Sequence, residues 1–207
     1  MNKNCANHEY GWKTAEPQDD HGYTWPAIRV LLPQEKLRVL DVGCGTGVIA
    51  SRLASLGHDV VGVDVAEDGI RLARSAYPGI RFEIASAYDD LREIAGAVDV
   101  VISSEVIEHL YSPQRYLENI HSVLVPGGAV IITTPYHGYL KNLALSVFNK
   151  WDDHHTVDWE GGHIKFFSPR TLTRMLSTAG YRDFRFRNAG RVRWLWKSMV
   201  CRARKTE

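Results

Sequence analysis

Short apolar runs rich in β-branched residues alternate with helical patterns from residue 38 onward. This alternation is typical of stacked βαβ units, in which helices connect parallel strands. The run at 59–65 is too apolar for a half-exposed strand, which indicates a parallel strand covered on both faces. We predict strands at residues 38–42, 59–65, 80–85, 98–103, 129–134, 182–188 and 197–204.

Glycine, proline and serine mark the ends of the helical patterns. Gly57 follows the pattern of 48–56 in the position of a helix stop. Ser112 with Pro113 is typical of a helix start, with the serine as the N-cap. Pro126-Gly127-Gly128 is expected to end that helix and to turn into the next strand. We predict further helices at 67–76, at 140–149 and, between a Ser168-Pro169 cap and Gly180, at 169–179.

These elements predict an α/β fold with one doubly wound sheet. No repeat, low-complexity tract or linker divides the chain, so 1–207 is expected to form a single domain. The insertion 135–167 is rich in aromatic residues and histidine, and its length suits a lid over a binding site. The alternative is that its aromatic residues only cover the sheet edge. The stretch 1–37, which carries Tyr10 and Tyr23, is expected to form a cap over the same face.

Composition narrows the function classes. The chain has 44% hydrophobic residues and a net charge of +1, from 25 basic and 24 acidic side chains. That balance argues against nucleic-acid binding that depends on the overall charge of the protein. No run of about 18 apolar residues is present. Because residues 1–8 are polar and lack the apolar core of a secretory signal, we expect no such signal. Because Cys5, Cys44 and Cys201 show neither pairing nor metal-ligand spacing, we expect a cytoplasmic protein.

A glycine-rich turn at the end of the first predicted strand is the strongest motif. It reads Asp41-Val42-Gly43-Cys44-Gly45-Thr46-Gly47, and Asp64 ends the second strand 17 positions later. Ligands of open α/β sheets bind at this edge, and a carboxylate there can accept hydrogen bonds from both ribose hydroxyls. Dehydrogenases space their glycines as Gly-x-Gly-x-x-Gly, whereas this turn is Gly-x-Gly-x-Gly after an acid. Asp41 would oppose a diphosphate and suits a cationic amino group.

From Arg38 to about Lys205, motif order and spacing resemble the Rossmann-like (class I) S-adenosylmethionine-dependent methyltransferases. The resemblance implies about seven strands, mostly parallel with an antiparallel C-terminal strand, and S-adenosylmethionine as cofactor. The resemblance also implies where each part of the cofactor binds. The glycine turn and the end of the fourth strand would hold the methionine part. The end of the second strand would hold the ribose, and the end of the third strand would hold the adenine. Many relatives carry an Asp near Ser86 or Ala87, which this chain lacks. The implied cofactor residues are Asp41, Gly43, Cys44, Gly45, Gly47, Asp64, Val65, Ser86, Ala87, Ser103, Ser104 and Glu105.

The run Glu105-Val106-Ile107-Glu108-His109 follows the fourth strand. It resembles the matching motif of ubiquinone-biosynthesis O-methyltransferases and of many sugar and natural-product methyltransferases. In the quinone enzymes this motif is associated with a divalent metal, so Glu105, Glu108 and His109 are candidate ligands. The alternative, which we favour, is a metal-free motif that fixes loop geometry.

Methyl transfer to a hydroxyl requires removal of a proton, for which imidazole is the natural base. His109 and His163 are the catalytic candidates, and the alternative for each is a structural role. His154 and His155 are further imidazoles in the insertion. Candidate substrate-binding residues are Tyr10, Tyr23, Glu108, Tyr136 and His163.

We therefore expect a methyltransferase acting on a small molecule, most readily at a hydroxyl oxygen of a quinone, phenol, sugar or lipid-linked glycan. N- or C-methylation, a nucleotide-dependent oxidoreductase and an idle binding protein are the alternatives. Nucleic-acid methylation is disfavoured, since the fourth strand lacks the Asn/Asp-Pro-Pro-aromatic motif.

The basic, aromatic run around Trp194 and Trp196 allows weak peripheral membrane contact, although a solvated loop is the simpler interpretation. Monomer and homodimer both stay open.

Overall fold

The computed structural model describes residues 12, 19–155, 161–190, 192 and 195–206. In this part of the chain seven strands form one sheet in the order β3-β2-β1-β4-β5-β7-β6. The neighbouring pairs from β3 to β5 are parallel, and β7 runs antiparallel to both β5 and β6. The strands are β1 (Arg38–Val42), β2 (Asp59–Asp64), β3 (Arg81–Ile84), β4 (Val98–Ser104), β5 (Leu124–Pro135), β6 (Tyr181–Ala189) and β7 (Ser198–Lys205). The expected doubly wound sheet with an antiparallel last strand is confirmed.

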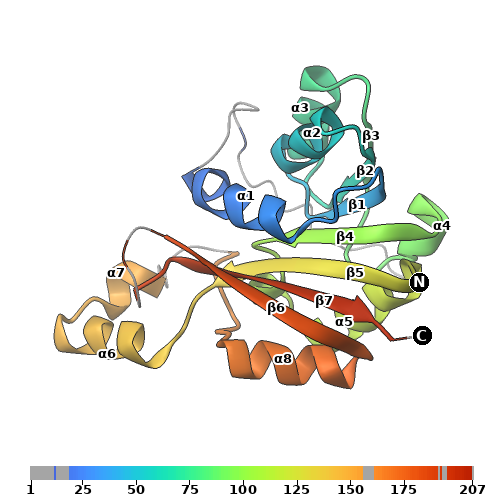
Figure 1. Cartoon of the computed structure of the whole chain (residues 1–207). Coiled ribbons are helices and arrows are strands. Elements are labelled where there is room, and N and C mark those ends of the chain that lie inside the picture. The colour runs from blue at the N-terminus through green and yellow to red at the C-terminus, as the bar shows by residue number, and fades with distance from the viewer. Residues whose placement is uncertain (1–11, 13–18, 156–160, 191, 193–194, 207) are drawn as a thin grey trace, which may run out of the picture.

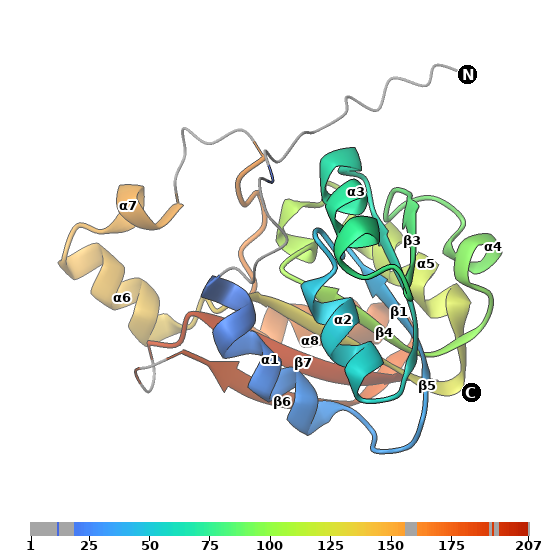
Figure 2. The same ribbon diagram turned by 90° about the horizontal axis from the view of Figure 1, so that it is seen from above.

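Helices cover both faces of this sheet, as Figure 2 shows. One face packs against α1, α2 and α3 through side chains such as Ile28, Leu53 and Ile70. The other packs against α4, α5 and α8 through side chains such as Leu91 and Leu117. The helices are α1 (Asp19–Leu31), α2 (Val48–Ser55), α3 (Glu67–Ala76), α4 (Leu91–Ala95), α5 (Pro113–Val123), α6 (Tyr139–Val147), α7 (Trp151–His155) and α8 (Pro169–Thr178), with a 3₁₀ turn, η1 (Ile107–His109).

The order of the strands reverses between β1 and β4. Asp41 on β1 lies beside Gly62 of β2 on one side and beside Ile102 of β4 on the other. The chain leaves β1 towards β2 and β3, and later returns to β4 on the opposite side (Figure 1). Such a switch point opens a crevice at the carboxyl ends of the strands, where ligands of this architecture bind.

Several predicted boundaries differ from the structure. The helix expected to reach Pro126 ends at Val123, and β5 begins at Leu124, which pairs with Val98 before the register shifts. Pro126-Gly127-Gly128 therefore lies within an irregular start of the strand. Helices α1 and α4 were not predicted. Ser112 precedes α5, but its side chain makes no capping hydrogen bond, whereas Ser168 forms the expected cap on α8.

Helices α6 and α7 follow β5 and lie beyond the carboxyl ends of the parallel strands (Figure 1). Helix α6 exposes apolar side chains on its outer side, among them Tyr139, Leu143 and Val147. Its single lysine, Lys141, is buried. In the part of the chain that the structure describes, no helix has the length and apolar character needed to cross a bilayer.

Candidate functional site

A cavity of about 320 Å³ opens at the carboxyl ends of β1, β2, β3 and β4, at the switch point of the sheet. Its floor is the glycine turn after β1, and its walls come from the segments that follow the other three strands. It is lined by Trp12, Val42, Gly43, Cys44, Gly45, Thr46, Asp64, Val65, Ala85, Ser86, Ala87, Ser104, Glu105, Val106, His109 and Leu110.

The glycine turn has left-handed backbone conformations, with φ of 74°, 50° and 80° at Gly43, Gly45 and Gly47. Residues other than glycine rarely adopt these backbone angles. A Cβ at Gly45 would approach the Trp12 ring at 3.3 Å, and a Cβ at Gly47 would meet the Phe82 ring at 2.7 Å. Gly45 therefore faces the cavity, while Gly47 packs against the body of the domain and does not line it.

Asp64 is held by two backbone groups. The N–H of Gly45 donates to its Oδ2 at 2.8 Å, and the N–H of Ala66 donates to its Oδ1 at 2.8 Å. Each carboxylate oxygen accepts one such bond and keeps a second acceptor position. Burial raises the pKa of Asp64, while the backbone N–H donors, with Ala66 first, oppose that rise. The side chain is thus oriented in the cavity wall as an acceptor for two hydroxyl groups.

Asp41 lies beneath the glycine turn and does not line the cavity. It is 1% exposed, and its Oδ2 has no hydrogen-bond partner among the described residues. Burial, reinforced by the charge of Asp64, raises its pKa from 3.8 to about 7. A cationic group bound above the turn would favour the ionised form of this carboxyl group. Ser103 is also buried, and its Oγ accepts a hydrogen bond from the Tyr116 hydroxyl at 2.7 Å.

The expected adenine side of the site is formed by the turn after β3. Val65, Ser86 and Ala87 all line the cavity. The Ser86 N–H donates to the carboxylate of Asp89 at 2.8 Å, and Ser86 Oγ accepts from the Tyr88 N–H at 3.2 Å. The turn carries an acidic residue at Asp89, but its carboxylate orders the backbone and does not line the cavity, so it does not take the place of the acid missing at 86 and 87.

Glu105 stands at the end of β4 with φ of 55°, which is rare for a side chain of its size. Its N–H is shared between the carbonyl oxygen (3.1 Å) and Oγ1 (3.0 Å) of Thr133, and Thr133 Oγ1 donates to Glu105 Oε1 at 2.8 Å. The buried threonine on β5 therefore stabilises this conformation and fixes the carboxylate in the cavity wall.

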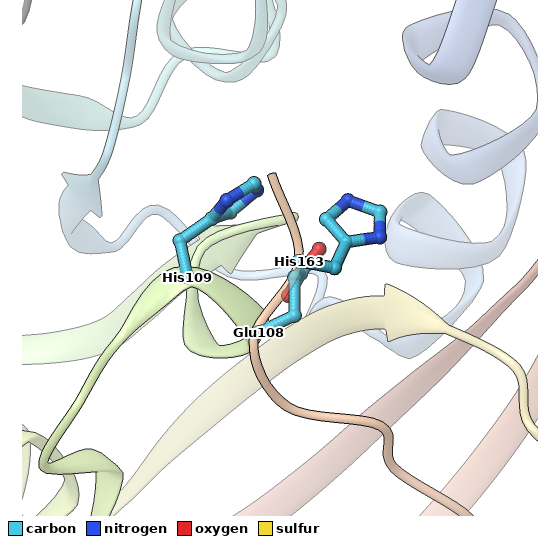
Figure 3. A group of neighbouring side chains, drawn as sticks. All are labelled: Glu108, His109 and His163. Carbon is cyan, nitrogen blue, oxygen red and sulfur yellow. The ribbon is translucent and has the colours of Figure 1, made fainter. Parts of the chain in front are cut away.

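Glu108, His109 and His163 come together beside the cavity (Figure 3). The N–H groups of Ile164 and Lys165 both donate to the Glu108 carbonyl, at 2.9 and 3.0 Å, which holds the 161–167 segment against η1. The His109 and His163 rings lie 4.8 Å apart in an edge-to-face arrangement. His109 Nδ1 lies 2.7 Å from the Gly161 carbonyl oxygen, which can only accept, so this nitrogen carries the proton. Burial lowers the pKa of both rings, so that both are neutral at pH 7.

This trio fits a divalent cation by its chemistry. One ligand atom from each residue lies within 4.8 Å of the others, and both Glu108 carboxylate oxygens are buried without a hydrogen-bond partner in the described residues. Burial and the neighbouring Glu105 raise the pKa of Glu108 well above its ordinary value, which favours the protonated form of this group when no cation is bound. The set differs from the one expected from sequence, in which Glu105 stood in place of His163.

The remaining predicted substrate residues are spread over the molecule. Tyr10 lies outside the described residues. Lys197 Nζ lies over the Tyr23 ring, 5.4 Å from its centroid. The Tyr136 ring packs edge-to-face on the Trp196 ring, with 5.4 Å between the ring centroids. Neither tyrosine lines the cavity. Trp194 of the proposed membrane run lies outside the described residues, while Trp196 is half-buried in this ring contact.

The prediction missed six of the residues that line the cavity. Trp12 was assigned only to a general cap, although its N–H is tied to Asp68 Oδ2 at 3.0 Å. The one available signal was an aromatic residue ahead of the first strand. The others are Val42, Thr46, Ala85, Val106 and Leu110, which are neighbours of predicted residues in sequence.

A family model described as a methyltransferase domain matches residues 19–184. A ubiquinone biosynthesis O-methyltransferase from Ruegeria pomeroyi is 35% identical over 155 residues, which cover 72% of this chain and 61% of that protein. The mitochondrial protein of that name from Rattus norvegicus is 33% identical over 159 residues, covering 72% and 45%. The chain thus spans about three fifths or less of the length of these curated relatives.

Solved structures show the same fold. An S-adenosylmethionine-dependent methyltransferase from Mesorhizobium loti superposes with a TM-score of 0.66 at 20% identity, covering 87% of this chain and 97% of that one. Magnesium protoporphyrin IX methyltransferase from Synechocystis, solved with bound SAH, gives 0.65 at 16% identity, covering 88% and 80%.

Proposed function

Since this chain belongs to the family of S-adenosylmethionine-dependent methyltransferases, we propose that it methylates a hydroxyl oxygen of a small molecule, with a phenol or quinol as the favoured class. The observation that carries this proposal is the cavity at the switch point, with the doubly hydrogen-bonded Asp64 in one wall and Glu105 and His109 in the opposite one. The names of the relatives, O-methyltransferases, support oxygen as the methylated atom.

The chain's residues fit the cofactor part by part. Asp64 would accept hydrogen bonds from the ribose hydroxyls, and the lack of a side chain at Gly45 lets Trp12 lie close to the turn. The turn after β3 would receive the adenine. Glu105 in the cavity wall and Asp41 beneath the glycine turn would supply negative charge for the ammonium and sulfonium groups of the bound cofactor. When bound, S-adenosylmethionine supplies an electrophilic methyl group on a positively charged sulfur.

The protein then positions the acceptor and accepts its proton. His109 lines the cavity, and its Nδ1 is committed to Gly161, so Nε2 is the basic nitrogen. We propose that Nε2 accepts the hydroxyl proton while the oxygen lies in line with the methyl group. His163 packs on the edge of this ring and holds it in place. We further propose that 135–167 closes over the acceptor as a lid.

A second candidate is the metal-assisted form of the same reaction. The buried, unpartnered Glu108 oxygens favour it. Glu108, His109 and His163 would hold the cation, which would polarise the acceptor hydroxyl as a Lewis acid.

The proposal is tested with three acceptors of similar size, catechol, an aromatic amine and a carbon acid, each incubated with labelled S-adenosylmethionine. We expect label in the methyl ether of catechol. His109→Ala should lower kcat about a hundredfold, whereas His121→Ala, on the far side of α5, should leave it unchanged. Label only in the amine or in the carbon acid would assign N- or C-methylation instead.

A further inference from the structure

Helix α6 buries its charged residue and exposes its apolar ones. Lys141 is 8% exposed, whereas Tyr139 is 78% and Val147 68% exposed. The Lys141 ammonium donates to the Lys197 carbonyl at 3.4 Å, which is long for such a bond, and no ion pair to it is seen among the described residues. A buried ammonium has three N–H donors, so folding leaves most of the hydrogen-bonding capacity of this one unused.

Three histidines, His137, His154 and His155, pack on one another within reach of the Lys141 charge. His137 stacks on His155 at 5.7 Å and meets the edge of His154 at 5.7 Å, and Trp151 stacks on the other side of His155 at 4.8 Å. Burial and the Lys141 charge lower the pKa of all three imidazoles, which are therefore neutral. The Nε2 atoms of His137 and His155 are enclosed without a hydrogen-bond partner in the described part of the chain.

The cluster is not a metal-ligand set. Among the described residues, the group of ligand atoms close enough to share a cation is Glu108, His109 and His163, and it includes none of these three histidines. A buried ammonium beside neutral imidazoles, each of which carries one N–H donor, is instead a group rich in hydrogen-bond donors. Such donors suit an oxyanion, because charge-assisted hydrogen bonds to phosphate or carboxylate are short and strong.

The cluster does not line the cavity, but the 161–167 segment joins it to the site. The His137 N–H donates to the Phe167 carbonyl at 3.1 Å, and the Ile164 N–H donates to the Glu108 carbonyl at 2.9 Å. The Glu105 charge acts on Lys141, and the charges of Lys141, His154 and His155 act on His163. Lys141 therefore lies within electrostatic reach of both a cavity-wall residue and the ring beside His109. We propose that Lys141, with His137 and His155, binds an oxyanion group, phosphate or carboxylate, carried by the acceptor. This inference rests on the proposed function, since it names the chemical class of the acceptor at the same site.

The test compares three small aromatic probes that differ in charge: phenol, benzoate and phenyl phosphate. Each is titrated by NMR into the full chain, with and without S-adenosylhomocysteine. We expect the native protein to bind at least one of the two anions about tenfold or more tightly than phenol. A phenyl phosphate preference assigns a phosphate, and a benzoate preference a carboxylate.

Variants then locate the preference. Lys141→Met should abolish it, Lys141→Arg should keep most of it, and Lys150→Met, an exposed lysine near the same helices, should leave it intact. If Lys141→Met does not fold, His155→Phe keeps a ring at that position and should weaken the preference. Equal binding of all three probes, or a preference that survives Lys141→Met, would overturn the inference. Absence of S-adenosylhomocysteine binding would count against the proposed function alone, because the oxyanion preference is measured without it.

Discussion

The backbone N–H of Gly45 donates a hydrogen bond to Asp64 Oδ2 at 2.8 Å, which joins the glycine turn after β1 to the carboxylate at the end of β2. The N–H of Ala66 occupies the other oxygen. The two halves of the candidate cofactor site therefore form one hydrogen-bonded unit before any ligand arrives. Preorganisation of this kind reduces the ordering that a ligand must impose on the protein.

Replacing Asp64 by Asn should weaken S-adenosylhomocysteine binding about ten- to hundredfold. The amide NH₂ cannot accept from a backbone N–H, so one of the two bonds breaks, together with an acceptor for the ligand. Calorimetric titration measures the effect. Asp59→Asn, at the exposed start of the same strand, is the matched control and should bind normally. Equal affinities of the two variants would show that Asp64 is not a ligand contact.

Gly47→Ala should destabilise the protein more than Gly57→Ala does. Both glycines have positive φ, 80° and 91°, but a Cβ at Gly47 meets Phe82 and Ala73, while a Cβ at Gly57 meets nothing within 4 Å. The backbone effect alone is about 1 kcal/mol, and crowding adds about 1–3 kcal/mol at Gly47. Urea denaturation compares the two variants. Equal losses would mean that the turn has room for a side chain.

Asp41→Asn should make the protein more stable at neutral pH. The pKa of Asp41 is raised from 3.8 to about 7, so between these values the unfolded chain has released a proton that the folded protein keeps. The free energy of unfolding therefore falls as pH rises through this window, by on the order of 4 kcal/mol. This contribution to the free energy of unfolding is fully present below about pH 4 and is lost above about pH 7. The side-chain amide of the variant cannot ionise, so the variant avoids this loss.

The measurement is urea denaturation of native protein and variant between pH 4 and pH 8. The two curves should coincide near pH 4 and diverge as pH rises, with the variant the more stable. Asp59→Asn, in which the replaced carboxylate is exposed, should follow the native protein throughout. Parallel pH dependence of the native protein and the Asp41→Asn variant would show that Asp41 ionises freely in the folded state.

Removal of divalent cations should leave methyl transfer unchanged, because the favoured mechanism uses His109 as the base. The protein is dialysed against a chelator, and initial rates are measured before and after. Readdition of Mg²⁺, Mn²⁺ or Zn²⁺ is the control. A rate that is lost on chelation and restored by one of these cations would transfer the role to a metal held by Glu108, His109 and His163.

Local sequence patterns predicted the sheet well, and most of the residues proposed from them to bind the cofactor line one cavity, for physical reasons. The glycine turn and Asp64 lie at the ends of consecutive strands, and parallel strand ends meet at one edge of a sheet. The antiparallel β7 came from the family resemblance. Short helix α4 carries too few residues for a clear periodicity, and α1, which includes Pro26 and several polar residues, lacks a strong apolar pattern.

Contacts between distant segments could not be predicted in this way. The pairing of Glu108 with His163 depends on how the 161–167 segment crosses η1, and Trp12 reaches Gly45 across more than thirty residues of sequence. The burial of Lys141 on α6 could not be predicted either, because the apolar residues of this helix, and not its lysine, would be expected to face inward.

The proposed function requires that a sulfonium nucleoside occupy the cavity at the switch point of the sheet. Calorimetry of the native protein with S-adenosylmethionine, S-adenosylhomocysteine and NAD tests this directly. Saturable one-to-one binding of the first two, with none of NAD, is the predicted result. Binding of NAD in the absence of binding by either sulfur nucleoside would contradict it.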